Sequence, residues 1–257
     1  MKNYDTIVGV GCSFMNGDAI SDKDGVALTP LHKMRPAIFL SEKLNCNEVN
    51  LAATGSSNDG MFRRIYNWVE DNKNKKTLMI IGLSGTARYP IWNRWRNRWF
   101  EIHPAHINSY DDTALTKVNK DITNGLGEVN ELRNWQKYYI KWIYNQEQED
   151  SKLQRNVMML HYYLKGNNID YYIFNSLEDS LGDIKDKINY ISFKKPEIDS
   201  WYRYLRYEMQ EVDNNNFRES DKYRSPKPPY GRQFCNGHPS PRAQEKLAER
   251  IYKELDK

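Results

Sequence analysis

The sequence predicts a three-layer α/β/α protein built on a doubly wound, flavodoxin-like parallel sheet. Short apolar runs alternate with segments whose apolar residues recur at helical spacing. Residues 77–83 are almost entirely apolar, as expected for a parallel strand that helices cover on both faces. The order strand, helix, strand, helix, strand in the amino-terminal part is typical of a doubly wound sheet.

Length and composition favour one domain. A chain of 257 residues can form one sizeable α/β core, and no shift in composition marks a second one. We therefore expect a single domain over residues 1–257, with an insertion at about 84–130. The 38 basic and 34 acidic side chains leave a net charge of only +4, which does not indicate nucleic acid as a partner.

The cysteines and the amino terminus indicate in which cellular compartment the protein is expected. Three cysteines without the spacing of a metal site fit a reducing environment better than a disulfide framework: Cys12, Cys46 and Cys235. No signal peptide is evident, and no apolar run reaches the length of a membrane span. We expect a cytoplasmic protein without membrane contact, while export by another route and the oligomeric state stay open.

The amino-terminal elements follow from their apolar residues. A first strand is expected at 7–10, a helix within 34–44 and a second strand at 48–52. Ser57 or Asn58 can cap the next helix. That helix has a predicted buried face at helical spacing: Met61, Ile65, Trp68 and Val69.

The insertion is rich in aromatic and basic residues. Arg88, Trp92, Trp95 and Trp99 are spaced so that a helix would place them on one face. Two interpretations stay open: the tryptophans stack a sugar or base, or they pack the insertion onto the sheet. Because the insertion follows the strand at 77–83, its start should lie over the carboxyl edge.

The carboxyl-terminal half continues the α/β pattern. Residues 132–165 predict one long or two successive amphipathic helices, in which His161 has a structural role. The next strand is expected at 169–174, and 213–234 is either an ordered loop or a flexible connector. In the final helix Pro241 fits the first turn, after a possible Ser240 cap, and three residues face the core: Ala243, Leu247 and Ile251.

Two residues stand where acyl-transfer chemistry would need them. The strand at 7–10 runs into Gly11-Cys12-Ser13, which would deliver Ser13 into a turn at the carboxyl edge, although a simple Gly/Ser turn is the alternative. His238 is fixed just before the final helix, and an imidazole pKa of about 6.5 suits proton transfer at neutral pH. His103 and His106 lack further metal ligands, so we expect a solvated loop there and neither metal nor other cofactor.

Four short blocks resemble those of the SGNH (GDSL-like) hydrolases, in the order found in that family. Residues 11–17 resemble the first block, 50–58 the second, 80–84 the third and 237–240 the last. The resemblance spans nearly the whole chain. It implies an SGNH-hydrolase-like fold and a hydrolase site assembled from all four blocks.

The resemblance also implies roles for individual residues. Ser13 would be the nucleophile and His238 the general base, while Gly55 and Ser84 would join Ser13 in an oxyanion hole. Three positions depart from the family: Cys12 and Cys235 replace aspartates, and Ser84 replaces an asparagine. Cys235, Asn58 and Arg88 are further candidates for orienting catalytic groups or contacting substrate, and Asp221 or a backbone carbonyl could orient the imidazole.

The expected function is therefore that of a serine esterase or deacylase. It would cleave a small ester or an O- or N-acyl group, with an acylated carbohydrate favoured by the aromatic insertion. The alternative is a catalytically weakened binding module for a carbohydrate or other ligand, motivated by the three departures from the family pattern. Nucleic-acid binding through the Arg/Trp insertion is the weakest of the three hypotheses.

Overall fold

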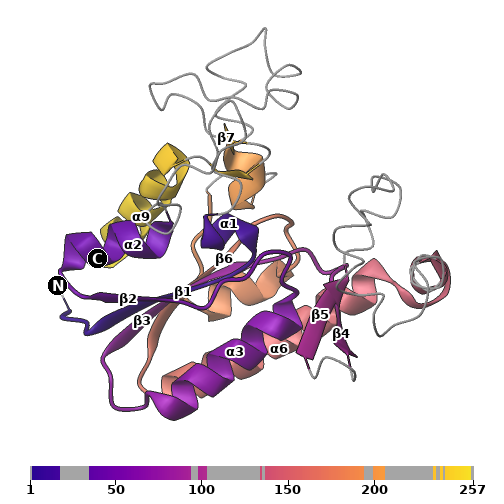
Figure 1. Ribbon diagram of the computed structural model, residues 1–257, viewed down its shortest axis with the longest axis horizontal. Helices are drawn as coiled ribbons and strands as arrows, with labels where there is room; N and C mark the ends of the chain where they lie inside the picture. Colours follow the sequence, from indigo (N-terminus) through magenta and orange to yellow (C-terminus); the bar gives the residue numbers. More distant parts are fainter. Residues whose placement is uncertain are drawn as a thin grey trace, which may run out of the picture.

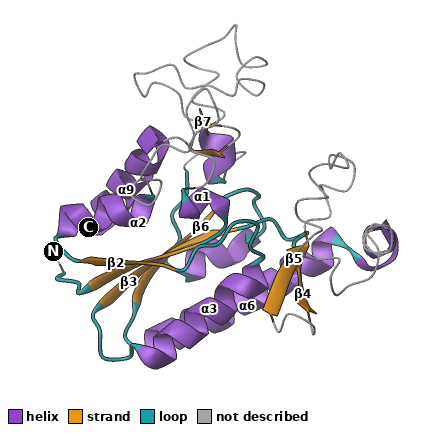
Figure 2. Ribbon diagram, viewed as in Figure 1, coloured by secondary structure: helices purple, strands orange, loops and turns teal. Residues whose placement is uncertain are grey.

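A parallel sheet lies between two layers of helices in the computed structural model (Figures 1 and 2). The structure describes residues 2–17, 35–93, 98–102, 134, 137–193, 199–205, 234–235, 238–239 and 241–255. Helices α2 and α9 cover one face of the sheet, and α3 and α6 cover the other. The predicted three-layer α/β/α fold is confirmed.

The main sheet has four strands in the order β2-β1-β3-β6, all parallel. Their bounds are β1 Thr6–Val10, β2 Asn47–Asn50, β3 Thr77–Leu83 and β6 Asp170–Asn175. Every residue of β1 and β3 is buried, because both strands are central and are covered on both faces. The strands predicted from apolar runs are present: β3 has the predicted bounds, and the ends of the others differ by at most two residues.

The helices on one face are α2 (Pro36–Leu44) and α9 (Pro241–Leu255), which contact each other. Pro36 occupies the first turn of α2, where its missing N–H costs no hydrogen bond. Pro241 begins α9 as predicted. The predicted inward face of α9 is confirmed, since these residues are fully buried: Ala243, Leu247 and Ile251.

The helices on the other face are α3 (Asn58–Asp71) and α6 (Gln146–Gly166). Ser57 is the N-cap of α3 and accepts a 3.1 Å hydrogen bond from the Gly60 N–H. His161 of α6 is buried and bonds the Tyr171 hydroxyl of β6, which confirms its predicted structural role. In the described part of the chain, no helix is both long and apolar enough to span a bilayer.

The first half of the region predicted to form amphipathic helices, residues 132–165, does not have the predicted buried face. A five-residue π-helix, η3 (Tyr139–Ile143), precedes α6. Tyr139 is buried, but Trp142 and Ile143 are exposed, so their helical spacing does not define a core face. Trp135 lies outside the described residues.

The start of the insertion is a β-hairpin, so the predicted helix through Arg88, Trp92 and Trp99 is wrong. Strands β4 (Tyr89–Asn93) and β5 (Arg98–Ile102) pair antiparallel, with Trp92 directly opposite Trp99. These tryptophans are seven positions apart, a spacing that fits one helix face but also cross-strand partners in a hairpin. Aromatic and β-branched residues favour strands. Trp95, His103 and His106 lie outside the described residues.

Short elements complete the described fold. Helix α1 (Ser13–Asn16) follows β1, and the 3-10 helix η4 (Gly182–Lys187) follows β6. Strands β7 (Phe234–Cys235) and β8 (His238–Pro239) pair antiparallel just before α9. Residues 201–205 are helical, while most of the predicted loop at 213–234 is outside the described part.

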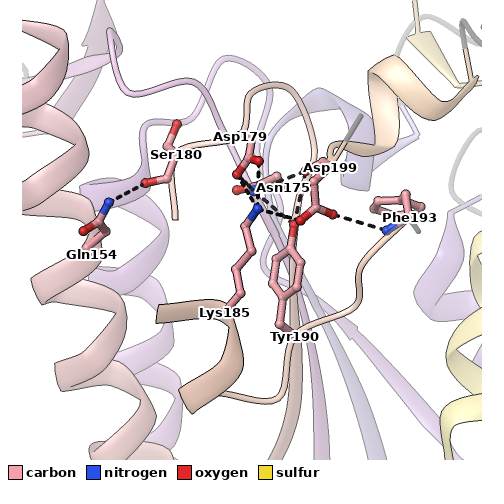
Figure 3. Close-up of polar contacts among 8 residues, drawn as sticks. All are labelled: Gln154, Asn175, Asp179, Ser180, Lys185, Tyr190, Phe193 and Asp199. Atoms are coloured by element: carbon pink, nitrogen blue, oxygen red, sulfur yellow. Dashed lines mark hydrogen bonds and ion pairs between the residues drawn. The ribbon is translucent and has the colours of Figure 1, made fainter. Parts of the chain in front are cut away.

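A polar network anchors the chain beyond β6 (Figure 3). The Lys185 ammonium lies 2.6 Å from a carboxylate oxygen of Asp179 and 2.6 Å from one of Asp199. The other Asp199 oxygen accepts a 3.3 Å hydrogen bond from the Phe193 N–H. Partial burial lowers the pKa of Lys185, but the hydrogen bonds to both carboxylates outweigh it and raise the pKa overall. The network therefore holds Asp179, Asp199 and η4 together.

We predict that Lys185→Met lowers the free energy of unfolding by about 2 to 3 kcal/mol, because it leaves two partly buried carboxylates without their cation. Lys187→Met is the matched control, since Lys187 is exposed on the same short helix. Urea unfolding of the three proteins measures the effect. Equal losses in both variants would contradict the assignment of the network as an anchor.

Candidate functional site

The carboxyl edge of the sheet brings Ser13 next to the loop that follows β2. Ser13 is the first residue of α1 and is only 6% exposed. Cys12, at the position of the family's aspartate, is the N-cap of α1 and is fully buried. Its thiol belongs to the hydrophobic core.

Two glycines allow α1 to lie directly on the strand ends. A Cβ atom on Gly11 would be 2.3 Å from Cγ of Met15, and one on Gly82 would be 2.8 Å from the same atom. Both distances are too short for real carbon atoms, so a side chain at either position would displace Met15 of α1. Gly11 was predicted to allow a turn; the structure shows that it and Gly82 also provide space for the helix that carries Ser13.

The loop at residues 51–57, here called the Gly55 loop, passes beside the end of β1. It continues the pairing of β2 with β1, because the Ala53 N–H donates to the Gly11 carbonyl at 3.0 Å. Gly55 has φ 73°, a left-handed conformation that glycine adopts without a steric penalty. The backbone of the candidate oxyanion loop is thus shaped by its glycine.

Two arginines brace the Gly55 loop from outside it. Arg64 of α3 donates from Nε to the Leu51 carbonyl and from Nη2 to the Ser56 hydroxyl, each at 2.7 Å. Arg88 donates from Nη1 to the Ser56 carbonyl at 3.1 Å. Charged donors make strong hydrogen bonds, so both arginines hold the loop in one conformation. The role of Arg64 was missed from the sequence, where nothing distinguishes it from the other arginine of its helix, Arg63.

Asn58 forms a double hydrogen bond with the backbone of Ser84. Its Nδ2 donates to the Ser84 carbonyl at 2.9 Å, and its Oδ1 accepts from the Ser84 N–H at 2.8 Å. Both residues are buried. The pair joins the start of α3 to the end of β3. Asn58 therefore positions the backbone at Ser84, and both polar atoms of the Asn58 amide are used in doing so.

The Ser84 hydroxyl is left available by this arrangement. Ser84 is 3% exposed, and its Oγ has no hydrogen-bond partner among the residues that the structure describes. A buried hydroxyl without a partner carries a desolvation cost that a bound polar group could relieve. Arg88 shows the same feature, since its buried Nε also lacks a partner within the described ranges.

The segment that carries His238 approaches α1 from the other end of the chain. The backbones of Cys235 and His238 are paired in the β7–β8 ribbon, and β8 contacts both α1 and α9. Gln244 of α9 donates to the Phe14 carbonyl at 2.6 Å, which ties α9 to the helix that begins with Ser13. The side chains of Cys235 and His238, and all of Asp221, lie outside the described part of the structure.

The polar groups at this edge come from three separate segments of the chain. In the described part of the chain, no group of three or more His, Cys, Asp or Glu residues is arranged to hold a metal ion. The arrangement instead combines a serine, a loop with left-handed glycine and a neighbouring segment that contains a histidine. These are the components that acyl transfer through a serine requires.

Comparison with known proteins connects this fold to esterases. No protein-family model and no curated protein matches the chain. A carbohydrate esterase structure matches with a TM-score of 0.51 and 14% identity, over 100% of this chain and 70% of that one. Its active site is described as having divergent catalytic and non-catalytic binding functions.

Two further solved structures are similar at lower TM-scores. The esterase EstA from Pseudoalteromonas sp. matches with 0.45 and 11% identity, over 98% of this chain and 97% of that one. A family two carbohydrate esterase from Clostridium thermocellum matches with 0.43 and 14% identity, over 100% and 64%. The chain shares the α/β fold of the carbohydrate esterase that matches with a TM-score of 0.51, which confirms the predicted fold class.

We predict that Arg64→Leu loosens the Gly55 loop, because the Leu51 carbonyl and the Ser56 hydroxyl lose their charged donor. The free energy of unfolding should fall by about 2 kcal/mol, and amide hydrogen exchange at residues 53–57 should become faster. Lys73→Leu is the control, since it removes one charge beyond the far end of α3. Unchanged exchange in Arg64→Leu would contradict the bracing role.

Proposed function

We propose that the chain is a serine esterase or deacylase that cleaves a small ester or an O- or N-acyl group. The observation that carries this proposal is the meeting of two distant segments at one sheet edge: α1, which begins with Ser13, and β8, which contains His238. The bond from Gln244 to the Phe14 carbonyl supports the same juxtaposition. The esterase fold makes acyl transfer the natural chemistry for this pair.

In the proposed reaction His238 accepts the proton of the Ser13 hydroxyl as Oγ attacks the acyl carbon. The tetrahedral intermediate then collapses, and the protonated His238 donates its proton to the leaving alcohol or amine. Water attacks the acyl-enzyme with His238 again as base. The carboxylic acid leaves, and the Ser13 hydroxyl is restored.

We propose the backbone N–H groups of Ser13 and Gly55 and the Ser84 hydroxyl as oxyanion donors. The bracing of the Gly55 loop by Arg64 and Arg88 supports this role, because donors fixed before the reaction need no reorganisation during it. The buried Oγ of Ser84, which lacks a partner in the described part of the chain, supports it further. Removing one such donor typically costs about 3 to 4 kcal/mol of transition-state stabilisation.

We propose that Ser13 and His238 act as a dyad and that Cys235 is not a third catalytic residue. Cys235 is the backbone partner of His238 in the β7–β8 ribbon and replaces the family's aspartate. A neutral thiol is a poor partner for an imidazolium. We therefore assign orientation of His238 to another group, either a backbone carbonyl or a carboxylate.

A second candidate function is a binding module with weakened turnover. It is favoured by the buried Cys12 and by Ser84 and Cys235, all of which replace functional residues of the family. The similar carbohydrate esterase has both catalytic and non-catalytic binding functions. For either candidate we propose an acylated carbohydrate as ligand class.

We predict that Ser13→Ala lowers hydrolysis of p-nitrophenyl acetate by about 10³-fold or more. Folding should be retained, because the change removes one oxygen from the start of a short helix. Ser41→Ala is the matched control, since Ser41 is also 6% exposed but lies in α2 and bonds the Ile38 carbonyl. Initial rates and thermal melting measure both properties. Activity of Ser13→Ala equal to that of the wild type would refute the assigned nucleophile.

A further inference from the structure

We infer that Arg63, Trp92 and Trp99 form a subsite for sugar rings that carry a carboxylate. The inference rests on the proposed function, because it names the substrate class of that site. It departs from the predicted helical platform, since the structure places two of the tryptophans on facing strands of a hairpin.

The two tryptophans form an exposed aromatic corner. Trp92 and Trp99 are cross-strand partners, with ring centroids 5.3 Å apart and ring planes at 68°. They remain 43% and 44% exposed. These exposed fractions show that the two tryptophans are not core residues. Contiguous exposed aromatic surface is typical of binding sites. Indole faces provide flat apolar surface for the C–H groups of a sugar ring.

Arg63 fixes this corner and supplies its charge. Its guanidinium carbon lies 3.9 Å from the ring centroid of Trp99, which is well within the range of a cation–π contact. Within the described ranges Arg63 forms no ion pair or hydrogen bond. The nearby acid on the preceding turn of α3 does not neutralise it, because Asp59 is paired with Lys152 at 2.9 Å. The N–H donors of Arg63 thus suit a ligand carboxylate.

The base of the hairpin is anchored, so the corner has a fixed position. Tyr89, the first residue of β4, packs on the buried Tyr139 with ring centroids 5.3 Å apart. An isolated two-stranded hairpin would be marginally stable, and this contact gives it support. A rigid aromatic surface loses little conformational entropy when a ligand binds.

The hairpin lies on the side of the molecule that leads to the candidate site. Figure 1 shows β4 and β5 beside the end of α3 that begins at Asn58, and α3 contacts β4. Arg88 connects the same region to the Gly55 loop, because it immediately precedes β4 and bonds the Ser56 carbonyl. A chain of sugar rings held at the hairpin can therefore extend toward Ser13.

The ligand chemistry follows from the combination of surfaces. Stacking on Trp92 and Trp99 fits sugars and nucleic-acid bases alike. Among the described side chains Arg63 is the cation that lies over these rings, and its guanidinium fits one carboxylate better than a run of phosphates. We therefore commit to an acidic oligosaccharide. Neutral oligosaccharides and single-stranded nucleic acid are outcomes of the test.

Calorimetric titration of the full chain tests the subsite with three probes. A hyaluronan tetrasaccharide alternates glucuronate with N-acetylglucosamine. Fully N-acetylated chitotetraose is its neutral counterpart, and a single-stranded DNA octamer represents nucleic acid. We expect the acidic tetrasaccharide to bind at least tenfold more tightly than either of the others. Equal or tighter binding of chitotetraose or DNA, or no binding of the acidic tetrasaccharide, would overturn the inference.

Variants locate the binding surface. Trp92→Ala and Trp99→Ala should each weaken binding of the acidic tetrasaccharide at least tenfold, and Trp99→Phe should restore most of it. Arg63→Met should remove the preference for the acidic probe. Trp142→Ala is the matched control, because Trp142 is also exposed and has Lys141 over its ring at 4.8 Å. Thermal melting checks folding. Undiminished binding in the folded Trp92→Ala and Trp99→Ala variants would place the ligand elsewhere.

Hydrolysis of p-nitrophenyl acetate separates this inference from the proposed function. The acidic tetrasaccharide should inhibit wild-type hydrolysis competitively and should inhibit Trp99→Ala at least tenfold more weakly. Hydrolysis that depends on Ser13, without binding of the tetrasaccharide, would refute the subsite and leave the esterase. Binding that depends on Trp92 and Trp99, without hydrolysis of any ester, would refute the esterase and leave the subsite.

Discussion

The contact of α1 with the ends of β1 and β3 is the constraint on which the rest of the site depends. Gly11 and Gly82 lack the Cβ atoms that would collide with Met15, so the helix that begins with Ser13 lies directly on the sheet. Gln244 then bonds the Phe14 carbonyl and fixes α9 against α1. The packing of α1 is thereby coupled to the position of α9.

The polar part of the site is fixed by long-range bonds to backbone groups. Arg64 and Arg88 hold the Gly55 loop, and Asn58 holds the backbone at Ser84. These bonds hold together the Gly55 loop and α3, which follow β2, and the residues that follow β3. The result is a set of polar groups whose positions are set before any ligand binds, which is the condition for effective stabilisation of a developing charge. Fixed positions of these groups are compatible with both proposed functions, catalysis and non-catalytic binding.

The sequence predicted features that depend on local order and missed those that depend on distant partners. Apolar runs and caps are local, so the strands, the Ser57 cap and the inward face of α9 were predicted correctly. The hairpin was missed because the spacing of Trp92 and Trp99 fits a helix as well as cross-strand pairing. The role of Arg64 could not be predicted, since its acceptors lie 13 and 8 residues away and are carbonyl and hydroxyl groups without a sequence signature.

Labelling with a fluorophosphonate tests most directly whether Ser13 is an activated nucleophile. Such a probe bonds covalently to a serine hydroxyl whose proton is removed by a neighbouring base and whose site stabilises the phosphoryl oxygen. Mass spectrometry of the digested protein should find the phosphonyl group on Ser13, with labelling strongly reduced in a folded His238→Ala variant. Folded wild-type protein that remains unlabelled at Ser13 would contradict the esterase account and favour a binding module.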